Sequence, residues 1–140
     1  MLQRIQSIWL LLASATSFAS LKMPFYTGHI LNKTTNQPQD WILNGMSNVF
    51  LMILVVAVAV AALIFLFLYK DRKKQMQFCI FGLIGAVIVV ALNFWQMQKF
   101  IDGTMALTSL LTFSTVVFYA LAVRGIWKDE QLVKSVDRLR

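Results

Sequence analysis

The sequence is short of charge, of cysteine and histidine, and of every motif that usually marks a reaction. Charged residues are 14% of its 140 residues, against about a quarter in soluble domains, while hydrophobic residues reach 59%. The single cysteine excludes an internal disulfide, and the single histidine, His29, has only Asp40 in its segment, too few groups to bind a metal. Phosphate-binding glycine loops and hydrolase signatures are missing. We expect a membrane protein that is not an enzyme and needs no cofactor.

Long apolar runs are what the sequence has instead. Three of them, at 45–69, 78–98 and 104–123, contain no charged residue. At about 1.5 Å per residue, each can cover the roughly 30 Å of hydrocarbon in a bilayer. A shorter apolar segment at 5–21 is near the lower limit for a span. The pattern predicts three transmembrane helices and a candidate for a fourth.

The first apolar segment has two interpretations. It follows the basic Arg4, and the small residues Ser17 and Ala19 near its end mimic the cleavage site of a secretory signal peptide. Cleavage would leave three helices, and retention would leave four. Three further spans already commit the chain to the membrane, so it needs no separate export signal. We therefore expect Met1 to stay on the mature protein and segment 5–21 to cross the bilayer.

The basic residues set an orientation. Ten of the thirteen Lys and Arg residues lie at Arg4, in the turn 70–74 or in the tail 124–140. Lys and Arg concentrate in cytoplasmic loops, so both termini are predicted to be cytoplasmic in a bacterial inner (plasma) membrane. The polar loop 20–41 and the short turn 99–103 then lie on the outer side, where we expect no second core.

Small and hydroxyl side chains within the spans predict helix packing. Small residues four positions apart let two helices approach closely, and a buried amide usually bonds to a neighbouring helix. The hydroxyls of Thr104, Thr108, Thr112 and Thr115 share one helical face, which either packs against protein or lines a small pore. The residues expected at helix contacts are Ala57, Ala61, Gly82, Ala86, Asn93, Thr108 and Thr112.

The tail 124–140 is predicted to form a short amphipathic helix. Apolar residues recur there at helical spacing, with basic residues beside them. Such a helix could lie on anionic lipid headgroups, dock on a partner protein, or be a solvated anchor that only fixes the orientation. Of the two binding modes we favour docking, because three acidic residues dilute its positive charge. The candidate contact residues are Leu132, Val133, Val136 and Leu139 on the apolar stripe, with Lys134, Arg138 and Arg140 beside it.

Both ends of the chain resemble a known family. The start, MLQRIQSIWLLLA, and the end, RGIWKDEQLVKSVDRLR, are similar to the domain of unknown function 4293 family, and the resemblance spans the chain. It implies a small four-helix integral membrane protein of Bacteroidota without an assigned activity. Trp127 departs from the family pattern, in which a basic residue is expected.

Together these features predict one domain at 1–140, an all-α integral membrane four-helix bundle with a short cytoplasmic amphipathic C-terminal helix. Our first hypothesis for its function is a small accessory or assembly subunit of a membrane protein complex. The alternative is a small homo-oligomeric pore or transporter lined by the threonine face. Expected partners are the lipid bilayer and either other integral membrane subunits or further copies of this chain. No nucleic acid is expected, because the basic excess serves orientation.

Overall fold

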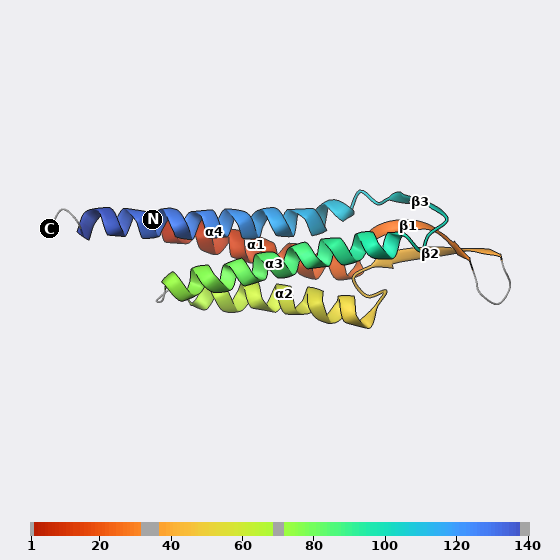
Figure 1. The fold of residues 1–140 in the computed structure, drawn as a ribbon, viewed down its shortest axis with the longest axis horizontal. Helices are drawn as coiled ribbons and strands as arrows, with labels where there is room; N and C mark the ends of the chain where they lie inside the picture. Colours follow the sequence, from red (N-terminus) through yellow and green to blue (C-terminus); the bar gives the residue numbers. More distant parts are fainter. Residues whose placement is uncertain (1, 32–36, 69–71, 138–140) are drawn as a thin grey trace.

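Within residues 2–31, 37–68 and 72–137, which the computed structural model describes, the chain forms four long helices and three short strands (Figure 1). In chain order the elements are α1 (Leu2–Lys22), β1 (Pro24–Leu31), β2 (Pro38–Asn44), α2 (Val49–Phe67), α3 (Arg72–Met97), β3 (Asp102–Met105) and α4 (Ser109–Asp137). The prediction of four helices is confirmed.

The helices form an antiparallel bundle. α1 packs mainly against α2 and α4, and α3 packs mainly against the same two helices. Consecutive helices run antiparallel, although β1 and β2 separate α1 from α2, and the two ends of the described chain lie at the same end of the bundle (Figure 1). α2 begins at a capped turn, where the Asn48 side-chain oxygen accepts the Phe50 N–H at 3.0 Å.

The bundle is apolar on its outside as well as in its core. Phe67 of α2 and Phe81 of α3, for example, are 74% and 68% exposed. Among the described residues, three helical segments are long and apolar enough to cross a membrane: Val49–Phe67, Lys74–Met97 and Ser109–Val133. α1 is not one of them, because its glutamines and hydroxyl side chains lower its hydropathy.

The prediction of an all-α fold was wrong, because the segment between α1 and α2 and the turn before the last helix form a sheet. Its three antiparallel strands lie in the order β2, β1, β3, with β1 in the centre. The sequence predicts loops at 20–41 and 99–103, but strand pairing there gives partners to backbone groups within both segments. The last helix therefore begins at Ser109 and not at Thr104, which belongs to β3.

An aromatic cluster joins the sheet to the bundle. The ring centroid of Phe25, at the start of β1, lies 5.9 Å from that of Phe94 on α3 and 6.0 Å from that of Phe113 on α4. The Phe25 carbonyl also accepts the Ala106 N–H at 3.1 Å, just before α4. These contacts hold the sheet as a continuation of the bundle along its long axis (Figure 1).

α4 is one continuous helix of 29 residues that includes most of the predicted tail. The sequence predicts a separate short helix after residue 123, but the described chain has no break there. The reason is that the stripe of the tail continues a face of α4 that is already buried at Ala122 and Ile126. The far end of α4 extends past the start of α1 (Figure 1).

Candidate functional site

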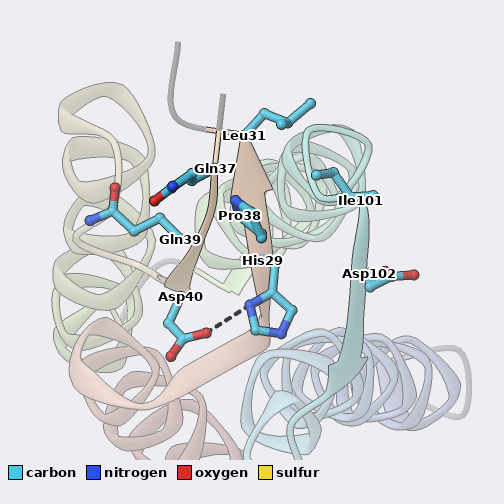
Figure 2. A pocket seen from close by; sticks show the side chains of 8 residues that line it. All are labelled: His29, Leu31, Gln37, Pro38, Gln39, Asp40, Ile101 and Asp102. Carbon is cyan, nitrogen blue, oxygen red and sulfur yellow. Dashed lines mark ion pairs between the residues drawn. The ribbon is translucent and has the colours of Figure 1, made fainter. Parts of the chain in front are cut away.

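An open hollow lies on the sheet around His29 (Figure 2). The strand register places His29 opposite Asp40 of β2 on one side and opposite Asp102 of β3 on the other. The His29 Nδ1 lies 2.7 Å from the Asp40 Oδ1, with 52% and 91% of these side chains exposed. Asp102 points away from the imidazole (Figure 2). The hollow is lined by His29, Leu31, Gln37, Pro38, Gln39, Asp40, Ile101 and Asp102.

The main polar interaction in this hollow is the ion pair between His29 and Asp40. An exposed pair of this kind contributes about 0–1 kcal/mol to stability. Within the part of the chain that the structure describes, no three His, Cys, Asp or Glu side chains are grouped so as to hold a metal ion. The sequence singles out His29 and Asp40 separately, but their pairing depends on the hairpin register, which the sequence analysis did not foresee.

Two glycines allow β3 to join the sheet. Gly28 of β1 and Gly103 of β3 lie directly opposite each other. A Cβ on Gly28 would lie 2.1 Å from the Asp102 carbonyl oxygen, and a Cβ on Gly103 would lie 2.5 Å from the Thr27 carbonyl oxygen. The backbones are therefore too close for any side chain at either position.

A second polar cluster, which we call the hydroxyl seam, lies between α1 and α4 and consists of Thr16, Ser17, Ser20, Thr112 and Thr115. The Thr16 and Thr115 hydroxyl oxygens are 2.9 Å apart, and the Ser17 hydroxyl donates to Thr115 Oγ1 at 3.5 Å. The cavity beside the seam measures about 10 Å³, no more than one water-sized sphere. The side chains of the hydroxyl seam therefore fill the space between the helices. The α1 members were missed from the sequence, although Ser14, Ser17 and Ser20 recur every three residues.

Three polar residues predicted at helix contacts lie in different settings. Thr108 donates its hydroxyl to the Pro24 carbonyl at the sheet, and Thr112 is buried in the hydroxyl seam. Asn93 is also buried, but its Nδ2 donates to the Val89 carbonyl of its own helix at 2.8 Å. Its Oδ1 has no hydrogen-bond partner among the described residues. The predicted interhelical bond of Asn93 was wrong, because the carbonyl four residues earlier is within reach.

The small residues predicted on α3 are buried. Gly82 and Ala86 are both covered, and a Cβ on Gly82 would lie 2.5 Å from Cε1 of Tyr119 on α4. The Tyr119 hydroxyl in turn donates to the Val58 carbonyl of α2 at 2.7 Å. Gly82 thus leaves room for a side chain that links three helices.

The small residues predicted on α2 do not form its buried face. Ala57 is exposed and Ala61 is half-buried, whereas Ala59 and Ala62 are fully buried. The bundle therefore does not use Ala57 and Ala61 as a packing pair, and their contact with a helix of a second protein stays a prediction. Every residue of α2 is apolar, so its sequence gives no indication of which face points inward.

The beginning of α1 and the second half of α4 meet in a third cluster. We call it the terminal clasp, and it consists of Gln6, Gly125 and Asp129. The Gln6 side-chain amide donates to Asp129 Oδ2, and both residues are buried. A Cβ on Gly125 would lie 3.0 Å from Gln6 Cγ, so glycine lets the amide approach. The sequence analysis placed Asp129 in a cytoplasmic amphipathic tail, among the acidic residues that dilute its positive charge. The signal that could have found the clasp is that both of its polar members lie in the segments that carry the family resemblance.

The predicted contact residues of the tail are described only in part. Leu132 and Val133 are 47% and 45% exposed, near the end of α4. The side chains of Lys134 and Val136, and residues Arg138, Leu139 and Arg140 as a whole, lie outside the described structure.

Comparisons with known proteins identify a family. No curated protein and no solved structure matches the chain. A family model described as domain of unknown function (DUF4293) matches residues 2–139, a range that includes the whole terminal clasp.

Proposed function

The chain belongs to the DUF4293 family, whose description assigns no function, and from that premise we propose that it is a small, non-catalytic accessory or assembly subunit of a membrane protein complex. The proposed setting is the inner (plasma) membrane of a member of the Bacteroidota, with both termini in the cytoplasm. Three apolar helices support a membrane location, and the distribution of Lys and Arg supports the orientation.

The side chains of α1 support its inclusion as a fourth span. Its exposed face carries Ile8, Leu11 and Phe18, which are 42–54% exposed. Its buried face carries Gln6 and Ser17. A helix with apolar side chains outward and polar side chains inward suits lipid on one side and protein on the other.

The observation that carries the proposal is on α4, where the face that is buried in the bundle continues into apolar residues that are about half exposed. Ala122, Ile126 and Asp129 recur at helical spacing and are only 0–8% exposed. Val133 is the next position on this face and is 45% exposed, with Leu132 beside it at 47%. Gln6, which contacts Asp129, lies near the start of α1, and the far end of α4 extends past that start (Figure 1). The half-exposed apolar face there suits a helix of another subunit.

The alternative of a pore lined by the α4 threonines has less support. Thr112 and Thr115 are 7% and 4% exposed, and the Thr115 hydroxyl contacts Thr16 and Ser17 of α1. A conducting path would require these hydroxyls to face a shared lumen. That rearrangement would separate them from their partners on α1.

Affinity purification of the full-length chain in mild detergent tests the proposal. We expect other integral membrane proteins to co-purify in stoichiometric amounts. Leu132→Asp combined with Val133→Asp should remove them, because each change places a carboxylate in an apolar contact. Lys134→Gln combined with Arg138→Gln is the matched variant at the same end of α4 and should retain them. Purification of the chain alone as a homo-oligomer would refute the subunit role. Loss of partners only with the charge variant would refute docking through the apolar face.

A further inference from the structure

The end of α1 carries a cleavage-site pattern that a retained helix leaves unused. Ser17 and Ala19 are small residues at the third and first positions before Ser20, the spacing of a signal-peptide cleavage site after an apolar run. In the orientation proposed above, this end of α1 faces the outer side, where signal peptides are removed. The peptide bond between Ala19 and Ser20 is thus placed where it could be cut.

In the folded protein, the backbone on both sides of that bond is hydrogen-bonded. The Ala19 carbonyl accepts the Met23 N–H at 3.2 Å, and the Ser20 carbonyl accepts the Gly45 N–H at 3.4 Å. The Ser17 carbonyl accepts the Ser20 hydroxyl at 2.7 Å. A protease binds backbone that is exposed and locally unfolded, so this helical turn must open before it can be cleaved.

Side-chain packing closes the same turn. Ser17 and Ser20 are 3% and 8% exposed and line the small cavity beside the hydroxyl seam. On the other side, the chain that leads into α2 lies directly against the turn. A Cβ on Gly45 would be 2.9 Å from the Leu21 Cα and 3.1 Å from the Ser20 carbonyl oxygen. The absence of a side chain at Gly45 therefore allows the bond to be covered closely.

We propose that the segment Ser17–Ala19 is a latent signal-peptidase site, which the docking of α1 into the bundle protects from cleavage. The inference rests on the orientation in the proposed function. In a chain whose α1 has not docked, the peptidase hydrolyses the bond: water adds across it, leaving a carboxylate on Ala19 and an amino group on Ser20. Completed bundles keep α1, whereas incomplete ones lose it together with the Gln6 half of the terminal clasp.

Substitution of Gly45 in the full-length, membrane-expressed chain tests this proposal. Gly45→Val forces a side chain against Leu21 and should free the end of α1. The fraction of chains that begin at Ser20 should then rise about tenfold. This rise corresponds to a decrease of about 1.4 kcal/mol in the free energy of local opening. N-terminal sequencing of protein purified through a C-terminal tag measures this fraction. Adding Ala19→Leu should abolish the product, because it removes the small residue before the bond.

Gly85→Val is the matched control. Its Cβ would meet the Val58 side chain at 3.1 Å, so it strains the contact between α2 and α3 without touching α1 and should leave Met1 in place. Three results would each overturn the proposal: intact Gly45→Val chains, cleavage that persists with Ala19→Leu, or unsubstituted chains that already begin at Ser20. A C-terminal reporter read from each side of the membrane tests the orientation separately. An outer C-terminus would refute the orientation, whereas a cytoplasmic C-terminus with uncleaved variants would refute only the latent site.

Discussion

Two helix contacts of the bundle are built from different groups. Hydrogen bonds at three levels join α1 and the start of β1 to α4 and the residue before it. They link Gln6 to Asp129, Thr16 to Thr115, and Pro24 of β1 to Thr108. Between α2 and α3 the contact is mainly apolar, with the rings of Phe65 and Phe78 stacked at a centroid distance of 5.7 Å.

The two contacts differ in what one helix requires from the other. α2 and α3 are each apolar enough to cross a membrane, so their contact mainly has to fill space, with one hydrogen bond from Gln75 Nε2 to the Phe65 carbonyl at 2.9 Å. α1 carries buried hydroxyls and an amide that lipid cannot satisfy, so it needs α4 for its polar side chains. The first helix therefore depends on the last, whereas α2, α3 and α4 are each apolar enough to cross a membrane.

The largest expected effect comes from the terminal clasp. Gln6→Glu places a second carboxylate beside Asp129 in a buried site and should lower the free energy of unfolding by about 3 kcal/mol. Adding Asp129→Asn exchanges the amide and the carboxylate and should restore most of the loss. Thermal unfolding in detergent measures both variants. If the double variant is as unstable as Gln6→Glu alone, the clasp does not act as a donor–acceptor pair.

A smaller loss is expected where α3 meets α4. Gly82→Val forces a side chain against the Tyr119 ring and should disturb the Tyr119 bond to Val58, at a cost of about 1–3 kcal/mol. Tyr119→Phe, which removes the hydroxyl alone, is the matched variant and should cost less. Equal losses in the two variants would show that the hydrogen bond, and not the space left by the glycine, dominates this contact.

The hydroxyl seam should contribute less again. Replacing Thr16 and Thr115 together by Val keeps the shape of both side chains and should cost about 0.6 kcal/mol and no more than about 1.7 kcal/mol, the average and the largest value measured for hydrogen bonds between membrane helices. Cysteine at Thr112 should react slowly with a water-soluble reagent, since the residue is buried. Rapid labelling there would show that water reaches the hydroxyl seam and would support the pore hypothesis.

The smallest effect is expected on the sheet. Asp40→Asn removes the carboxylate from an ion pair that is largely exposed, so the unfolding free energy should change by less than about 1 kcal/mol. The change should also shrink with added salt, unlike the loss from Gln6→Glu. Unfolding at two salt concentrations distinguishes the exposed pair from the buried clasp.

The sequence predicts the helices well because long uncharged runs have one solution in lipid. It predicts helix faces poorly where every residue is apolar, as the exposed Ala57 of α2 illustrates. The sheet was missed because segment 20–41 was predicted to be one polar loop, and because Thr104 and Met105 continue an uncharged run into what looks like a span. The terminal clasp was missed because its two polar members are separated by 123 positions, and no local pattern reports such a contact.

The length of α4 has a mechanical consequence. Its 29 residues form a rod about 43 Å long at about 1.5 Å per residue, without a proline to bend it. One end is tied to the sheet through Thr108 and Pro24, and the other carries the half-exposed Leu132 and Val133. A rigid-body tilt of about 5° at the sheet would displace the far end of such a rod by about 4 Å. The contacts of Thr115 and Asp129 with α1 lie between the two ends and oppose such a tilt.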